Sequence, residues 1–233
     1  MSRDALAAAL GLALASAGCI SVGGGGTQPD RRAYDLLPEP SPSEPAEADG
    51  PEVIWVEPFT ADKALDRDEI VWRRGAVESG AWEHHRWARP PAEAIRSLLA
   101  DALARSGACA AVATEPRPAL ADYRLGGHLA RCDETDAEDG WTGVLEVRVA
   151  LVRTSDGAEV MRRTYSVVEK APQRNPLGVV RALRAAAEKA GKALAKDVAV
   201  VLESHRTSQG APPAPPTDGP PEPEPGPGDS GER

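Results

Sequence analysis

The chain has 233 residues, which is enough for one ordinary domain with a tail at each end. Its 22 glycines and 22 prolines exceed the usual share and gather near the two ends, whereas residues 51–205 have enough apolar side chains to bury a core. The formal net charge of −9, without a basic patch, argues against a nucleic-acid partner.

The N-terminus has the composition of an export signal. Arg3 precedes an apolar run from Ala5 to Ala15, which is too short to span a bilayer as a helix, and small residues then lead into Cys19. Residues 1–18 therefore resemble a lipoprotein signal peptide, after which the Cys19 thiol receives diacylglycerol. Acyl chains such as palmitate then hold the mature protein on a membrane. An ordinary cleaved signal followed by an incidental cysteine is the alternative.

Both ends of the mature chain are predicted to lie outside the folded domain. Residues 19–50 contain four successive glycines, several prolines and several acids, and they cannot bury enough apolar surface to offset the entropy lost on ordering. We interpret them as a lipidated, flexible tether. Residues 206–233 contain nine prolines and five glycines, which predicts a disordered, acidic tail. The domain is thus expected to span residues 51–205.

The first half of this domain predicts a strand, a hairpin and a helix. The apolar run Val53–Val56 is stopped by a proline and indicates a strand. The segments Ile70–Arg74 and Ala76–His84 lie on either side of a glycine and favour a hairpin. Two prolines then open a helix at Ala92, whose apolar residues recur every three or four positions until Gly107 ends it.

The second half predicts four strands and a long helix. Cys109–Ala113 and Tyr123–Leu129 are interpreted as strands around a proline-rich turn. Gly143–Arg153 and Val160–Val168 alternate in hydropathy around a Ser-Asp-Gly turn, which predicts an antiparallel hairpin. An amphipathic helix of about seven turns begins at Pro176. The order predicts an α+β fold: an antiparallel sheet with two helices, the longer one C-terminal, on one face.

Histidines and an acidic run are the candidates for catalytic or metal chemistry. His84 and His85 are neighbours on a predicted strand, so their side chains point to opposite faces and do not readily ligate one ion together. The acids between positions 133 and 139 lack the spacing of a calcium loop, and we interpret them as a solvated turn between strands. We therefore predict no catalytic residue, no cofactor and no metal ligand.

Cys109 and Cys132 remain once Cys19 carries lipid. An oxidising compartment would permit a disulfide between them. The predicted hairpin, however, places Cys109 opposite a residue near Gly126, well short of Cys132. We favour two buried free thiols and leave the disulfide open.

Tryptophans supply five of the nine aromatic residues. Trp55 lies in an apolar run and is interpreted as core, and Trp87, beside two prolines, is expected to pack over the first helix. Trp72 and Trp82 lie among charged residues on the predicted hairpin, where exposed indole rings suit a protein interface. They form the candidate partner surface, with a secondary core over the helix as an equal alternative.

Several short motifs, in their order and spacing, resemble a known family. These motifs are Tyr34-Asp-Leu36, Val53-Ile-Trp-Val-Glu-Pro58, Leu65-Asp-Arg67, Ile70-Val-Trp-Arg73, Trp87-Ala-Arg-Pro-Pro91 and Tyr123-Arg-Leu-Gly126. Together with the terminal amphipathic helix, they resemble the ABC-type transport auxiliary lipoprotein family, of the paraquat-inducible protein C type. The resemblance covers about residues 34–202.

The resemblance implies a non-enzymatic lipoprotein on the periplasmic face of the outer membrane. It would act as an auxiliary or adaptor component for an ABC transporter permease and ATPase that work with an MCE-domain protein to move lipids or other apolar solutes. Ile20, in place of an aspartate after the cysteine, implies sorting to the outer membrane. A homo-oligomer stays open. The alternatives are a structural envelope lipoprotein that assists assembly of another outer-membrane complex, and a periplasmic hydrolase or metal enzyme.

Overall fold

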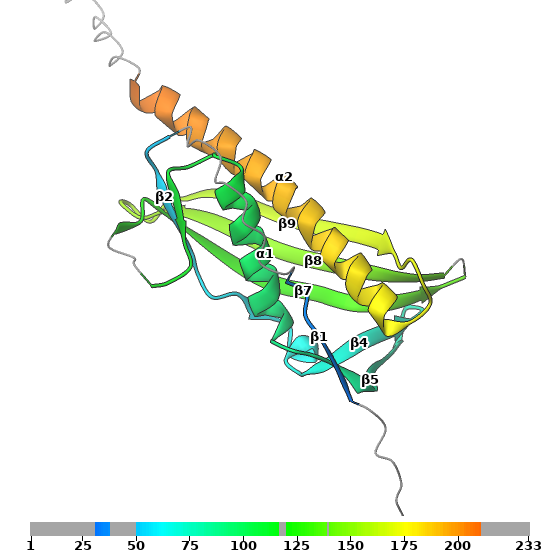
Figure 1. Ribbon diagram of the computed structural model, residues 1–233. Coiled ribbons are helices and arrows are strands. Elements are labelled where there is room, and N and C mark those ends of the chain that lie inside the picture. The colour runs from blue at the N-terminus through cyan, green and yellow to red at the C-terminus, as the bar shows by residue number, and fades with distance from the viewer. Residues whose placement is uncertain (1–30, 38–49, 117–119, 139, 211–233) are drawn as a thin grey trace, which may run out of the picture. The chain divides into compact units, whose positions relative to one another are not determined.

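The computed structural model describes residues 31–37, 50–116, 120–138 and 140–210 (Figure 1). The signal peptide with Cys19, most of the predicted tether and the tail from residue 211 lie outside these residues. The described residues all belong to one compact unit. The elements are β1 (Arg32–Tyr34), β2 (Val53–Val56), β3 (Thr60–Ala61), the 3-10 turn Lys63–Leu65, β4 (Glu69–Arg74), β5 (Glu78–Trp87), α1 (Pro91–Arg105), β6 (Ala111–Ala113), β7 (Tyr123–Ala137), β8 (Gly140–Arg153), β9 (Glu159–Lys170) and α2 (Pro176–Gly210).

The strands of the described residues form one nine-stranded, mixed sheet. Its centre is β7, which pairs antiparallel with β8 and parallel with β2, β3 and β4. The β4–β5 and β8–β9 hairpins are antiparallel, as predicted, and β7 joins β8 in antiparallel to form a β7–β8–β9 meander. The pairs of β2 with β6 and of β2, β3 and β4 with β7 are parallel, and in each of them the chain crosses over through α1 between the two strands, as parallel neighbours need a long connection. β1 also pairs in parallel with β5, and the chain between them passes through β2, β3 and β4. The α+β class is confirmed, whereas the sheet is mixed instead of purely antiparallel.

Two details of the predicted strand pairing are wrong. β6 does not form a hairpin with β7 but pairs in parallel with β2, where Val112 lies beside Ile54. β7 also does not end at Leu129: it continues through the acidic run until Ala137 pairs with Gly140. The pairing of β6 and the length of β7 both depend on side-chain contacts between strands, and the hydropathy of each segment alone does not reveal these contacts.

α1 has the predicted start and stop signals, and α2 has the predicted start signal. α1 begins at Pro91, where the missing amide costs no hydrogen bond, and Gly107 follows its end with a φ of 71°. Asn175 caps α2, because its side-chain oxygen accepts a hydrogen bond from the Gly178 amide at 2.8 Å. α2 then runs for 35 residues along the sheet.

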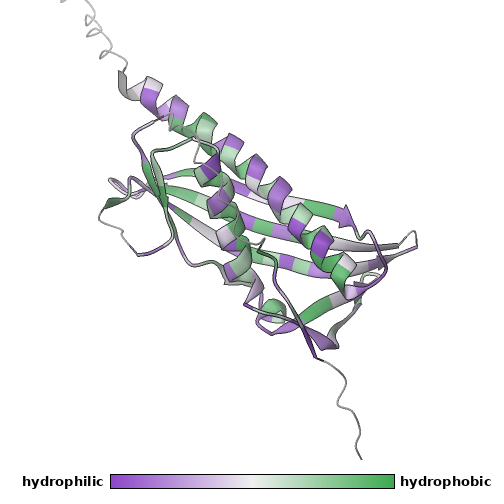
Figure 2. Ribbon diagram, viewed as in Figure 1, coloured by the Kyte–Doolittle hydropathy of each residue, from purple (hydrophilic) through white to green (hydrophobic). Residues whose placement is uncertain are grey.

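The two helices pack on the same face of the sheet, and the core lies between these layers (Figure 1). Figure 2 shows hydrophobic and hydrophilic residues interleaved along α2, as in an amphipathic helix. Gly143 of β8 allows this helix to approach closely, because a Cβ there would lie 2.9 Å from the Leu183 backbone nitrogen. The fully buried leucines and isoleucines include Ile54, Leu99 and Leu125.

The end of the predicted tether belongs to the fold. β1 pairs in parallel with β5, and Leu36 is 1% exposed. Arg184 of α2 donates hydrogen bonds to the backbone carbonyls of Asp35, Leu36 and Leu37 at 3.1, 2.8 and 2.7 Å. The tether prediction is therefore wrong for residues 32–37, because a few apolar side chains within this polar segment reach the core.

The start of the predicted tail is also ordered. α2 continues to Gly210, five residues beyond the predicted end of the domain at 205. No helix of the described residues is long and apolar enough to cross a membrane.

Candidate interaction surfaces

Trp72 is held in place by its neighbour across the β4–β5 hairpin. It is the direct partner of Gly80, and a Cβ on Gly80 would lie 2.3 Å from Cζ2 of the indole ring, so the ring lies over the glycine. The guanidinium carbon of Arg74 lies 5.5 Å from the ring centroid, which is a cation–π contact. Trp72 therefore presents an ordered, half-buried indole ring, and its contact with a partner stays a prediction.

Trp82 of β5 is also half-buried, but it is fixed by a polar bond and by aromatic neighbours. Its Nε1 donates a hydrogen bond to Oε2 of Glu134 at 2.8 Å. Its ring meets His85 edge-on at a centroid distance of 5.7 Å and lies tilted against Trp141 at 5.5 Å. Trp82 packs against the main core. The secondary-core alternative from the sequence thus describes Trp82 better than Trp72.

Of the two tryptophans predicted to be core, Trp87 is buried and Trp55 is not. Trp87 is 5% exposed, as expected for a ring that packs with the core. Trp55 is half-buried, so its interpretation as core is wrong. Its neighbours Ile54 and Val56 are fully buried, and the alternation of a strand therefore directs Trp55 to the sheet face away from the helices.

Two acids of the predicted solvated turn are buried, which contradicts that interpretation. Asp133 is fully buried on β7 and forms ion pairs with Arg131 at 2.7 Å and Arg73 at 3.5 Å. Glu134 is 3% exposed, and burial raises its pKa, although the hydrogen bond from Trp82 opposes the shift. The strand continues through these residues because each carboxylate has a partner.

The histidines are not gathered at one site. His85, His128 and His205 each bond to a different residue, and none of these partners is a histidine. His85 Nδ1 shares a hydrogen bond with the Tyr34 hydroxyl at 2.9 Å, and burial lowers its pKa, helped by repulsion from Arg32 and His84. His128 lies 2.9 Å from Asp62, an exposed acid near β3. Within the described ranges, no three His, Cys, Asp or Glu side chains are placed to hold a metal ion.

Cys109 and Cys132 are free and buried, which confirms the favoured prediction. Burial, with repulsion from Glu52, raises the pKa of the Cys109 thiol to about 11. Burial also raises the pKa of Cys132, with a contribution from neighbouring Asp133. Both thiols are therefore protonated near neutral pH and are poor nucleophiles.

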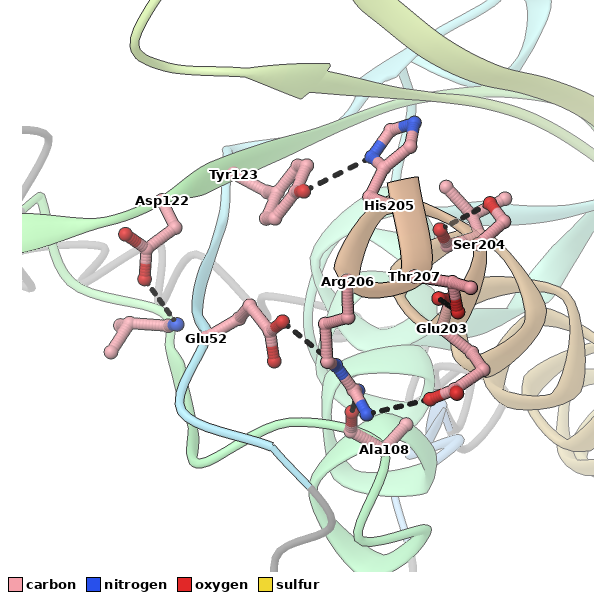
Figure 3. A network of polar contacts seen from close by, with 11 residues as sticks. Glu52, Ala108, Asp122, Tyr123, Glu203, Ser204, His205, Arg206 and Thr207 are labelled. Atoms are coloured by element: carbon pink, nitrogen blue, oxygen red, sulfur yellow. Dashed lines mark hydrogen bonds and ion pairs between the residues drawn. The ribbon is translucent and has the colours of Figure 1, made fainter. Parts of the chain in front are cut away.

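The end of α2 forms a polar cleft with the start of β2 and β7 (Figure 3). The cleft has a volume of about 560 Å³. Arg206 donates a hydrogen bond to Glu52 Oε1 at 2.9 Å and reaches the Ala108 carbonyl at 3.4 Å. The Tyr123 hydroxyl shares a hydrogen bond with His205 Nδ1 at 3.1 Å, and burial raises the pKa of Tyr123.

This cleft is not predicted from the sequence, because Arg206 falls in the predicted tail. One signal could have found it: no proline or glycine occurs between Gly191 and Gly210, so nothing stops the helix at 205. Glu52 and Arg206 are 154 positions apart, so no local sequence pattern predicts the hydrogen bond between them.

Comparisons with known proteins agree with this architecture. The family model described as "ABC-type transport auxiliary lipoprotein component" matches residues 34–195. A crystal structure of a Xanthomonas campestris protein is 20% identical with a TM-score of 0.61, and the match covers 70% of this chain and 97% of that one. The structure of an uncharacterized protein is 17% identical with a TM-score of 0.59, over 72% and 99% of the two chains. No curated protein matches the chain significantly. The two structural likenesses show a shared fold.

Proposed function

Because the chain belongs to the family of ABC-type transport auxiliary lipoprotein components, we propose that it is a non-enzymatic adaptor of an MCE-type transport system. In this role it holds a permease, an ATPase and an MCE-domain protein in register with the outer membrane while lipids or other apolar solutes cross the periplasm. The observation that carries the proposal is the family match, which spans nearly all of the described fold.

The anchor in this proposal is Cys19, and the sequence after it sets the working distance. About a dozen residues separate Cys19 from Arg31, where the compact unit begins. A fully extended chain of that length reaches at most about 40 Å. The domain therefore works close to the periplasmic face of the membrane that holds its acyl chains.

The partner surface in this proposal is the β4–β5 hairpin, with Trp72 at its centre. The ring is half-buried and ordered by Gly80 and Arg74, which suits an anchor residue because little side-chain entropy remains to be lost on binding. Arg73 of the same hairpin faces away from Trp72 and is engaged by the buried Asp133. The hairpin is thereby fixed to the central strand.

Affinity capture of the full-length, tagged chain from cross-linked membranes tests the role. We expect an MCE-domain protein and the ATPase and permease of one transporter to be recovered together, and we expect Trp72→Ala to reduce their recovery. Recovery of another outer-membrane assembly without these three components would contradict the proposal and favour a structural envelope role. The size of the complex, measured without the partner, also reports whether the chain forms a homo-oligomer.

A further inference from the structure

An open groove follows the seam between α1 and α2, on the side away from the sheet. The helices approach closely at Gly191, where a Cβ would lie 2.7 Å from the Ala102 Cβ. Beyond this contact the facing residues are small, so they do not fill the space between the two backbones. The resulting groove has a volume of about 530 Å³, which is within the range of small-ligand sites.

The floor of the groove is aliphatic. It is formed by one leucine and four alanines, none of which has a polar side-chain atom: Leu98, Ala102, Ala108, Ala195 and Ala199. Leu98 and Ala195 are 4% and 6% exposed and belong to the packed interior, whereas Ala102 and Ala199 are half-buried and face the groove from its two helices. Such a floor offers contact to an alkyl chain and no hydrogen bond to a polar one.

The rim of the groove is cationic, although the chain as a whole has a net charge of −9. Arg105, Lys192 and Lys196 stand on the rim against a single acid, Glu188. All four side chains are on exposed residues, and none of the four has a hydrogen bond or an ion pair to another described residue. Most other arginines of the described fold are paired with acids, so this concentration of unpaired positive charge is a local feature.

We propose that this groove binds an amphiphile with one apolar chain and an anionic head, as in an acyl chain of an anionic lipid. The chain would lie along the alanine floor, and the head would be placed between the two lysines and Arg105. An exposed charge pair contributes little alone, but three cations at the end of an apolar groove act together on one anion. The inference goes beyond the proposed function, because an adaptor need not bind the transported solute itself.

Binding can be measured on residues 31–233, because this compact unit contains every residue of the hydrophobic core. The probe is a dansyl-labelled undecanoic acid, compared with the uncharged dansyl-labelled alcohol of the same chain length. Fluorescence enhancement is titrated for the wild type and for three variants, after circular dichroism and melting curves have shown that each one is folded.

The variants separate the two halves of the site. Lys192→Glu combined with Lys196→Glu should weaken acid binding about tenfold, and raised salt should weaken it as well, with little effect on the alcohol. Ala199→Phe, which fills the groove, should weaken both probes about tenfold. Arg181→Glu is the matched control, since Arg181 is an exposed cation of α2 outside the groove, and it should change neither probe.

Three results would overturn the proposal. The first is the absence of saturable acid binding by the folded wild type. The second is an affinity that is equal for the acid and the alcohol and that does not change in the Lys192→Glu, Lys196→Glu variant. This result would indicate a nonspecific apolar surface. The third is self-association that hides the groove and is abolished by Ala199→Phe, which would make it an interface between copies of the chain. None of these outcomes depends on the transporter partner, so the adaptor role is tested separately.

Discussion

Trp72 and Trp82 lie on paired strands of one hairpin, yet their surroundings give them different roles. Trp82→Ala should lower the free energy of unfolding by about 2–3 kcal/mol, because it removes a core-packed ring and leaves Glu134 without its donor. Trp72→Ala should cost less than about 1 kcal/mol of stability but weaken partner capture by about 2 kcal/mol. Chemical unfolding and quantitative capture measure the two effects.

His84→Ala is the control for this pair, since it removes a half-buried side chain of β5 without touching either ring. Unchanged capture by a folded Trp72→Ala variant would move the binding surface away from the hairpin. A large loss of stability in that variant would instead make Trp72 part of the core.

Glu134 predicts a pH dependence at the level of a single carboxyl group. Burial raises its pKa above the usual value of 4.5, so the folded state holds the proton more tightly than the unfolded state. The stability contributed by this proton is present at low pH and is lost as the pH rises from 4.5 through the raised pKa. Glu134→Gln keeps an acceptor for Trp82 without the charge. We therefore expect this variant to be at least as stable as the wild type at neutral pH.

Unfolding free energies measured from about pH 4 to pH 8 check this expectation. The profile of Glu134→Gln should be flatter in this range, whereas Glu115→Gln, at an exposed position, should follow the wild type. A Gln variant that is clearly less stable at neutral pH would show that the carboxylate charge is needed, with Arg74, which attracts this charge, as the candidate partner.

At the scale of elements, α2 packs on the sheet and also holds two early segments of the chain by hydrogen bonds. Arg184 in its first half binds three carbonyls of the segment after β1, and Arg206 near its end binds Glu52 before β2. Both contacts join residues that are about 150 positions apart. The helix therefore closes the domain by holding its beginning at two points.

Two truncations test the second of these contacts. Removal of residues 211–233 should leave the melting temperature nearly unchanged, because their composition supports no packed core. Removal of residues 206–233 also deletes Arg206 and should lower the melting temperature by several degrees, about the effect of 1–2 kcal/mol in a domain of this size. Arg206→Ala in the full chain is the matched single change. Equal melting temperatures for both truncations would mean that the Arg206 contacts contribute no net stability.

The elements predictable from the sequence are those whose signals are local. The Ser-Asp-Gly turn and the alternation around it give the β8–β9 hairpin, and Asn175-Pro176 gives the start of α2. The parallel pairing of β6 with β2 was not predictable, because both strands are short apolar runs that fit several partners. The burial of Asp133 depends on Arg131 and Arg73, and only the fold brings Arg73 to it. The interhelical groove has no sequence signal, since its floor alanines are typical of any helix.

At the scale of the whole molecule, the first described segment joins both layers of the fold. β1 runs parallel to β5 in the sheet, with Tyr34 beside Trp87. Directly after β1, the carbonyls of residues 35–37 accept hydrogen bonds from Arg184 of α2. This segment is therefore held by the sheet on one side and by the long helix on the other.

The anchor itself is tested by Cys19→Ser in cells grown with labelled palmitate. We expect the wild-type chain to be labelled and processed, and the variant to remain an unlabelled precursor, because both acylation and cleavage of a lipoprotein require the thiol. Cys109→Ser is the control, since that thiol is buried and protonated and should not accept lipid. Label that survives in Cys19→Ser would contradict the lipid anchor. Label lost in Cys19→Ser, with the processed wild type in inner-membrane fractions, would keep the anchor but contradict the outer-membrane location.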